Sequence, residues 1–281
     1  MNMKKNSVSK KVATICRTAV LWLCALTAIF PFIWMVGASL KKETDVFEVP
    51  FKLFPDYLYL DNFKEVWFGN YDYPRMFFNS VIVVVLGVGV SLLLCCIAGY
   101  GFARLKFPGR DKIFLIYLAT MMVPPQLLMV PKYLMFREIR IYDTLWSLIL
   151  PSFFSIYGVF MMRQFMQQIP ESLSEAARID GAGEWYICFK IIIPLCKPAI
   201  LTLLILFFSW QWNDYDNALL FLQSKENYTL PLGLTYFMDE TGLKYNLIMA
   251  AGVITILPIF VVFLVAQKYF IGGLTAGAVK E

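Results

Sequence analysis

Long stretches without a charged side chain constrain the fold of this chain more than any other feature. The 281 residues are 59% hydrophobic and 16% charged, whereas soluble domains are nearer half apolar and a quarter charged. A helix needs ~20 apolar residues to cross ~30 Å of hydrocarbon. The sequence therefore predicts an all-α integral membrane protein with six transmembrane helices. The predicted helices cover about residues 18–40, 76–103, 113–131, 144–162, 198–220 and 245–267.

The distribution of Lys and Arg predicts that both termini are cytoplasmic. Residues 1–17 form a basic tail, and the following uncharged run is too long for a secretory signal and lacks a small-x-small cleavage site. This first span is therefore predicted to be a retained anchor. With the N-terminus inside, basic residues concentrate in the inner loops, including residues 163–197. Residues 268–281 are predicted to form a cytoplasmic tail that is too short and glycine-rich to fold alone.

Several classes of chemistry are excluded by composition. The chain has no histidine, which rules out a His-ligated metal, a Ser-His-Asp triad and an imidazole proton relay. None of the six cysteines falls in a predicted outer loop, so structural disulfides are not expected. We assign no catalytic or metal-binding residue and expect no nucleic-acid partner. The uncharged runs on which the spans are based hold no Asp, Glu, Lys or Arg, with Asp214 just beyond the run 198–213, whereas ion-coupled carriers usually bury charges in the membrane.

The third predicted span contains a break. Its Val123-Pro124-Pro125-Gln126 segment removes backbone hydrogen bonds in mid-membrane, which is tolerated against protein or a water-filled cavity. Two interpretations stay open at this point: a helix that faces the interior of a bundle, or a kink with no role in a pathway.

The inner loop, residues 163–197, carries the most informative pattern. Pro170 suits a first helical turn, and Gly181 suits the left-handed position after a helix end about three turns later. A second helix is predicted from about Glu184 until Pro194 forces a break before the fifth span. The loop therefore predicts two short helices joined by a hinge.

The first of these short helices has a face suited to docking. Leu173, Ala176, Ala177 and Asp180 recur at i, i+3, i+4 and i+7, and the two alanines keep this face flat. A helix lying on the membrane surface is the alternative. However, Arg178 is the single basic residue in 164–189, whereas interfacial helices are usually rich in Lys and Arg.

This loop resembles that of a known family. Glu175-Ala176-Ala177, three residues, Gly181, nine residues, Ile191, one residue and Ile193-Pro194 match the EAA loop of ABC importer permeases, with Ile193 where the family usually has Leu. The resemblance runs nearly end to end with the sugar-importer branch, the maltose-type second permease. Its further motifs are Phe30-Pro31-Phe32-Ile33-Trp34, Phe78-Asn79-Ser80, Trp212-Asn213-Asp214, Thr229 to Leu234 and Gly273 to Lys280.

The resemblance implies a type I ABC importer permease fold and a multi-pass protein of the bacterial cytoplasmic membrane. It implies a transport subunit, not an enzyme, that forms a sugar or oligosaccharide path with a second, homologous permease. Further implied partners are a cytosolic ABC ATPase dimer, which binds ATP and Mg²⁺ in place of this chain, an extracytoplasmic solute-binding protein, and membrane lipid. The implied ATPase-coupling residues are Glu175, Ala176, Ala177, Asp180, Gly181 and Pro194.

Other functions stay open on the residues alone. A secondary carrier for a small solute is the alternative, and a membrane-bound enzyme or assembly factor comes third. Co-purification with a second permease and an ATPase would favour the importer, whereas proton- or sodium-driven uptake by this chain alone would favour the carrier.

The end of the fifth span supplies a candidate solute pathway. A carboxylate in the membrane is expected to face water, and sugars bind to aromatic faces and hydrogen-bonding groups. The alternative is that these residues are ordinary interfacial anchors. The Asn217-Ala218 pair departs from the Pro-Leu of many relatives and leaves the end of this helix open. The candidate pathway residues are Trp210, Trp212, Asn213 and Asp214.

Overall fold

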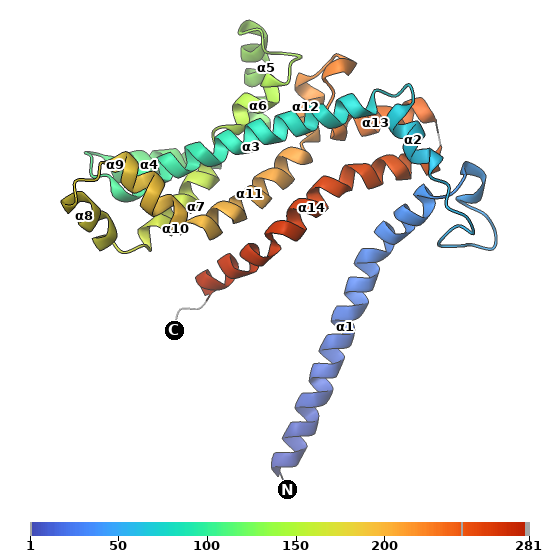
Figure 1. Ribbon diagram of the computed structural model, residues 1–281, viewed down its shortest axis with the longest axis horizontal. Helices are drawn as coiled ribbons and strands as arrows, with labels where there is room; N and C mark the ends of the chain where they lie inside the picture. Colours follow the sequence, from blue (N-terminus) through green and yellow to red (C-terminus); the bar gives the residue numbers. More distant parts are fainter. Residues whose placement is uncertain (1, 243, 279–281) are drawn as a thin grey trace. The chain divides into compact units, whose positions relative to one another are not determined.

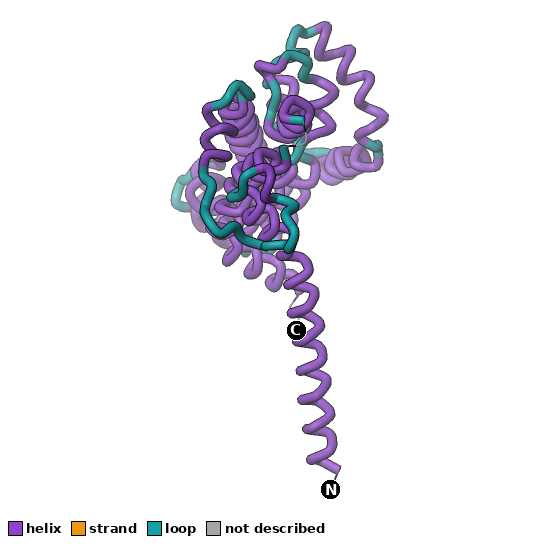
Figure 2. Tube along the Cα trace, turned by 90° about the vertical axis from the view of Figure 1, so that its right-hand side faces the viewer, coloured by secondary structure: helices purple, strands orange, loops and turns teal. Residues whose placement is uncertain are grey.

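A computed structural model describes residues 2–242 and 244–278, and this part of the chain consists of helices and loops without a strand (Figure 2). The chain divides into two compact units. Unit 1 comprises Met1–Tyr71 with Phe237–Thr255, and unit 2 comprises Asp72–Tyr236 with Ile256–Glu281.

Among residues 2–242 and 244–278, four helical segments are long and apolar enough to cross a membrane. They are Thr14–Ser39, Tyr73–Arg104, Trp146–Gln167 and Tyr245–Val265. Two further helix pairs pass the same test but are bent: Arg110–Met122 with Pro125–Glu138 by 90°, and Glu184–Leu195 with Lys197–Trp212 by 77°. By length and composition, the described residues therefore hold four candidate spans, or up to six if each bent pair is one span. The predicted all-α membrane fold is confirmed.

The elements follow the chain in a simple order (Figure 1). Unit 1 contains α1 (Asn2–Ser39), η1 (Glu43–Asp45) and α2 (Asp61–Phe68). The helices of unit 2 up to the inner loop are α3 (Tyr73–Arg104), α4 (Arg110–Ala119), η2 (Thr120–Met122), η3 (Pro125–Leu128), α5 (Met129–Glu138), α6 (Trp146–Ser152) and α7 (Ile156–Gln167). The later ones are α8 (Ser172–Ile179), α9 (Glu184–Tyr186), η4 (Ile187–Ile192), α10 (Ile193–Leu195), α11 (Lys197–Trp212), α12 (Tyr215–Phe221) and η5 (Lys225–Asn227). Two helices, α13 (Leu230–Thr241) and α14 (Tyr245–Ala278), each contribute residues to both units.

Polar side chains organise unit 1. The Asn62 amide donates to the carbonyls of Ser39 at 2.8 Å and Lys41 at 2.7 Å, and Asn246 donates to the Asn62 side-chain oxygen at 2.8 Å. The Lys41 side chain is 2% exposed, and its ammonium donates to the Lys52 carbonyl. These bonds satisfy backbone groups that the end of α1 leaves without helical partners.

Helix α3 is the centre of unit 2, and it packs most extensively against α7, then against α11 and α6 (Figure 1). Glycine permits the closest approach. A Cβ built on Gly99 would lie 2.6 Å from the Met162 Cβ and 3.2 Å from the backbone nitrogen of Arg163. Small residues at such crossings let helix backbones approach each other in a membrane.

Asp143 joins the loop between α5 and α6 to the loop between α12 and η5. Its carboxylate accepts from the backbone N–H groups of Gln223 and Ser224, each at 2.8 Å, and from the Ser224 hydroxyl. Burial disfavours this carboxylate, but the hydrogen bonds outweigh burial and hold the pKa of Asp143 below its usual value. An apolar cluster that includes Phe136 and Phe221 packs beneath these loops.

The third predicted span, residues 113–131, is not one straight helix. Helix α4 and η2 end before Val123, which is extended with ψ 116°, and the chain turns by 90° into η3 and α5. Pro124 and Pro125 supply no backbone N–H, and a proline disfavours helical geometry in the residue before it. Met122 is 84% exposed and Val123 is 42% exposed, so the bend does not face the interior of this chain's own bundle.

Two other predicted bounds differ from the structure. The fifth helix was expected to run over 198–220, but α11 ends at Trp212 and a separate helix, α12, begins at Tyr215. The segment expected as a C-terminal tail, 268–281, is helical as far as Ala278 because α14 continues into it. Extending an existing helix costs far less than nucleating a new one, even through glycines. Residues 279–281 lie outside the described residues.

We predict that Gly99→Val lowers the melting temperature of the detergent-purified protein, because overpacking a helix crossing costs roughly 1–3 kcal/mol. Gly101→Val is the matched control. A Cβ at Gly101 meets nothing within 4 Å, and both positions lie inside α3, so the change in helix propensity is the same. Equal melting temperatures for the two variants would contradict the close α3–α7 contact.

Candidate functional site

The inner loop folds into the predicted pair of short helices. Helix α8 ends with Gly181 at φ +82°. The Gly181 N–H donates to the Arg178 carbonyl at 3.0 Å, and the Ala182 N–H donates to the Ala177 carbonyl at 2.9 Å. These two bonds form a Schellman motif with the glycine in the left-handed position. The prediction for Gly181 is confirmed, and a Cβ there would meet nothing within 4 Å.

The faces of α8 differ in part from the prediction. Ser174 and Ala177, one turn apart, are buried against the chain, whereas Glu175, Ala176 and Asp180 are exposed. Ala177 therefore does not share an exposed face with Ala176 and Asp180 as expected, and its role in coupling stays a prediction. Helical spacing alone did not show which of two adjacent alanines turns inward, since neighbouring residues point about 100° apart on a helix.

Arg178 links α8 to the rest of unit 2. Its Nε donates to Glu184 Oε1 at 2.7 Å, and the Tyr100 hydroxyl of α3 donates to Glu184 Oε2 at 2.5 Å. The bond to Glu184 holds the pKa of Arg178 above its usual value. The Glu175 carboxylate has no hydrogen bond or ion pair to any residue within 2–242 or 244–278. It is therefore available to a partner.

Arg104 fixes the entry to the loop. The residue is 9% exposed, and its Nη2 donates to the carbonyls of Met166 at 2.6 Å and Ile169 at 2.5 Å. These carbonyls lie at the end of α7, where helical partners run out. One guanidinium therefore binds the end of α3 to the start of the loop.

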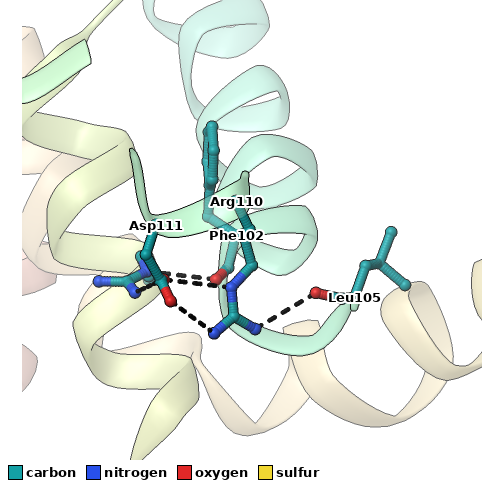
Figure 3. A network of polar contacts seen from close by, with 5 residues as sticks. Phe102, Leu105, Arg110 and Asp111 are labelled. Carbon is teal, nitrogen blue, oxygen red and sulfur yellow. Dashed lines mark hydrogen bonds and ion pairs between the residues drawn. The ribbon is translucent and has the colours of Figure 1, made fainter. Parts of the chain in front are cut away.

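A second polar network closes the turn between α3 and α4 (Figure 3). Arg163 of α7 donates to Asp111 Oδ1 at 2.9 Å and to the Phe102 carbonyl at 3.2 Å. Arg110 donates to the Leu105 carbonyl at 3.3 Å and also contacts Asp111. The cations of the α3–α4 turn and of α7 therefore gather at the same end of unit 2 as α8.

The second short helix leads into a sharp bend. It begins at Glu184, passes through a π-helical turn at Ile187–Ile192, and ends at Leu195. Pro194 is exposed and cannot donate a hydrogen bond to the carbonyl four residues earlier. The chain then turns by 77° into α11. The break therefore falls within two residues of the position that the sequence indicated.

A polar recess of about 330 Å³ opens between α5, α6, α11 and α12. A second recess of about 180 Å³ shares three of its residues, Ser152, Trp210 and Gln211, and continues along α3 to Ser91. Together they form a polar track beside α3. The larger recess is lined by Lys132, Ser147, Leu148, Pro151, Ser152, Trp210, Gln211, Asp214 and Asn217.

The structure brings together two of the four candidate pathway residues. Trp210 and Asp214 line the recess. Trp212 is 2% exposed and stacks on Phe208 with the ring centroids 5.5 Å apart, so it belongs to the core. Asn213 is exposed and donates to the Ser209 carbonyl of its own helix at 2.8 Å. In a helix, the two indoles of a Trp-Gln-Trp sequence point to different sides, which explains why one lines the recess and the other is in the core.

Asp214 also has a structural role. It is the N-cap of α12, accepting from the backbone N–H of Asn217 at 3.2 Å and from the Asn217 side chain at 2.9 Å. An aspartate at this position satisfies an N–H that the first helical turn leaves unpaired. This cap explains why the helix restarts at Tyr215 and why an asparagine stands at 217.

Sequence reasoning missed most of the recess. Lys132, Ser152 and Asn217 come from three different elements, so no local spacing connects them. Gln211 did carry a signal, because an amide between two tryptophans in an uncharged run is costly in a membrane without a polar partner. Its side chain donates to the Leu148 carbonyl at 3.3 Å. In the described part of the chain, no group of three or more Cys, Asp or Glu residues is placed to hold a metal ion.

Comparison with known proteins finds relatives over almost the whole chain. Residues 91–275 match the family described as binding-protein-dependent transport system inner membrane component. The arabinooligosaccharides transport system permease protein AraQ of Bacillus subtilis (strain 168) is 34% identical over 99% of this chain and 100% of its own length. The lactose transport system permease protein LacG of Rhizobium radiobacter is 30% identical over 98% of this chain and 99% of its own length.

A solved structure is similar throughout. A chain of a bacterial ABC transporter involved in the import of the acidic polysaccharide alginate superposes with a TM-score of 0.85 and 25% identity. The match covers 93% of this chain and 98% of that one.

Proposed function

The chain belongs to the family of binding-protein-dependent transport system inner membrane components, and we propose that it serves as a permease subunit of an ABC importer for oligosaccharides. It is a multi-pass protein of the cytoplasmic membrane. Its relatives AraQ and LacG are named for arabino-oligosaccharides and lactose, which are neutral sugars with many hydroxyl groups. The polar recess offers a matching combination of one exposed indole with amide, hydroxyl and charged groups.

The partners follow from the same assignment. We propose a second, homologous permease, a cytosolic ABC ATPase dimer that binds ATP and Mg²⁺, and an extracytoplasmic solute-binding protein. The description of the matched family names dependence on a binding protein, which supports the solute-binding protein as a partner. The bundle of this chain supplies the membrane-spanning part, and the free energy of ATP hydrolysis comes from the ATPase.

We propose that the exposed face of α8 couples this chain to the ATPase. Glu175, Ala176 and Asp180 are exposed on α8, whereas Arg178 attaches the helix to α3 through Glu184. A partner that binds Glu175 therefore moves a helix that is connected to the bundle. Gly181 ends α8 in a tight turn and Pro194 lies before the bend into α11, so both shape the element.

We place this end of unit 2 in the cytoplasm, together with both termini. Arg104, Arg110, Arg163 and Arg178 lie at one end of the unit, as their hydrogen bonds to neighbouring elements require. Cytoplasmic loops of membrane proteins carry an excess of such cations.

We place the solute path along the polar recess, with Trp210 and Asp214 among its lining residues. The recess continues along α3 to Ser91, a buried hydroxyl at its far end. Water bridges between such polar groups and a solute hydroxyl are common in binding sites. Trp212 packs in the core and Asn213 bonds back to its own helix, so neither lines the recess.

Charge reversal and hinge substitution test the coupling role. We predict that Glu175→Lys and Gly181→Val both leave the protein inserted in the membrane, while sugar uptake falls and ATP hydrolysis stops responding to loaded binding protein. Loss of one partner from a desolvated charged pair costs roughly 2–5 kcal/mol. A Cβ in a left-handed conformation costs about 1–2 kcal/mol. Uptake and ATPase activity are measured side by side in reconstituted vesicles.

Matched controls separate coupling from general damage. Glu138→Lys makes the same charge change on the exposed surface of α5. Gly183→Val adds the same side chain two residues away, where φ is −74° and the Cβ has open space. Both controls are expected to transport normally. Normal coupled uptake in both test variants would contradict the assignment of α8 and Gly181 to coupling.

Thiol labelling tests the solute path. We predict that a cysteine at Ser152, which lines both parts of the recess, reacts with a membrane-impermeant maleimide in at least one transport state, and that excess transported sugar slows the reaction. The background carries Cys16→Ser and Cys24→Ser, because the other four cysteines are buried. Thr202→Cys, buried in α11, is the unreactive control. A Ser152→Cys thiol that never reacts would exclude the recess from the path.

A further inference from the structure

The joint between α3 and the inner loop, residues 163–197, holds a buried cation without an acidic partner among the described residues. The Arg104 guanidinium is bound by two carbonyl oxygens, and no Asp or Glu of the described residues forms an ion pair with it. Its Nε is buried with no hydrogen-bond partner in that same part of the chain. Buried charges are usually paired, because removing an ion from water is costly. The positive charge of this joint therefore calls for an anion from elsewhere.

A recess of about 460 Å³ opens beside this arginine. Three cations and one carboxylate line it, and the carboxylate of Glu184 is already bound by Arg178 and Tyr100. The net charge of the lining is therefore +2. The lining residues are Arg104, Leu105, Lys106, Phe107, Arg178 and Glu184.

A neighbouring recess extends the positive surface. It measures about 760 Å³, shares Lys106 and Phe107 with the first, and is lined by residues 106–112. Its one acidic residue, Asp111, is bound by Arg110 and Arg163 (Figure 3). The Lys106 side chain is 85% exposed, and its ammonium forms an ion pair with Glu171 Oε1 at 3.8 Å. Lys112 has no ion-pair partner among the described residues. Each acid within the two recesses is thus already paired.

The surroundings indicate what kind of anion fits. Arg104 is the last residue of the membrane-crossing segment Tyr73–Arg104, so the recess lies at the level where lipid headgroups meet water. The adjoining first turns of α4 expose Ile113, Leu115 and Ile116, of which the last two are each 68% exposed. A basic recess next to an exposed apolar helix face matches a molecule with an anionic head and an acyl chain. A soluble acidic protein would leave the apolar face uncovered.

We propose that the basic joint formed by Arg104, Lys106, Lys112 and Arg178 binds the phosphate headgroup of an anionic phospholipid, whose acyl chain lies along the exposed face of α4. The lipid phosphate neutralises the charge that Arg104 brings into the joint. A lipid bound at this site contacts both α3 and the inner loop, and holds them together.

Native mass spectrometry of the intact transporter tests this site, with all partner subunits present and phosphatidylglycerol or phosphatidylcholine titrated in. We expect phosphatidylglycerol to bind more tightly than phosphatidylcholine. The double variant Lys106→Gln/Lys112→Gln is expected to weaken phosphatidylglycerol binding about tenfold or more, since each removes an attractive charge near the headgroup. Both lysines are exposed, so folding is preserved. Lys64→Gln/Lys190→Gln, which changes two exposed lysines outside the recesses, is the matched control.

Three outcomes would overturn the proposal. The first is equal affinity of the wild type and the Lys106→Gln/Lys112→Gln variant for phosphatidylglycerol. The second is displacement of the lipid by millimolar inorganic phosphate, which would indicate a small-anion site. The third is lipid binding that appears only after the ATPase has been removed, which would assign the recess to an acidic protein surface. Lipid binding is measured without transport, so the result stands whatever solute the transporter carries.

Discussion

The inner loop, residues 163–197, depends on one buried guanidinium. Arg104 ends the central helix α3 and donates to two carbonyls at the exit of α7, so three segments meet at a single charged side chain. Hydrogen bonds from a charged donor are stronger than neutral ones, and burial increases their cost of breaking. One helical turn earlier, Tyr100 reaches Glu184, which holds Arg178 on α8. The connection from α8 to the bundle therefore runs through polar bonds, while the exposed face of α8 stays free for a partner.

The sequence was most informative where local backbone chemistry decides the structure. Gly181 was predicted in a left-handed turn because a helix of that length, ending in glycine, has few other ways to satisfy its last carbonyls, and the structure confirms it. The bend near Pro194 follows from the missing N–H. Orientation was beyond local rules. Ala177 turns inward with Ser174 because tertiary packing, which no spacing encodes, chooses the face of a helix whose two sides are nearly equally small.

The same limit applies to the spans and to the recess. Six apolar runs indicated six spans, but the third is bent by 90° at its proline pair and the fifth ends at Trp212, where Asp214 caps a new helix. The helix cap was readable in principle, since an aspartate directly before a helical segment is a frequent start signal. The recess was not, because Lys132, Ser152 and Asn217 meet only after four helices have packed. Trp212 joined the core for the same reason.

Protection of α8 by an ATPase tests the coupling assignment most directly. Single cysteines are placed at Ala176, on the exposed face of α8, and at Ile139, which is 50% exposed after α5, in a background that carries Cys16→Ser and Cys24→Ser. Alkylation is timed in the permease pair with and without the bound ATPase. The thiol at 176 is predicted to react freely in the permease pair and to be protected in the full complex, whereas the thiol at 139 reacts equally in both. Equal reactivity at 176 with and without ATPase would contradict α8 as the coupling element.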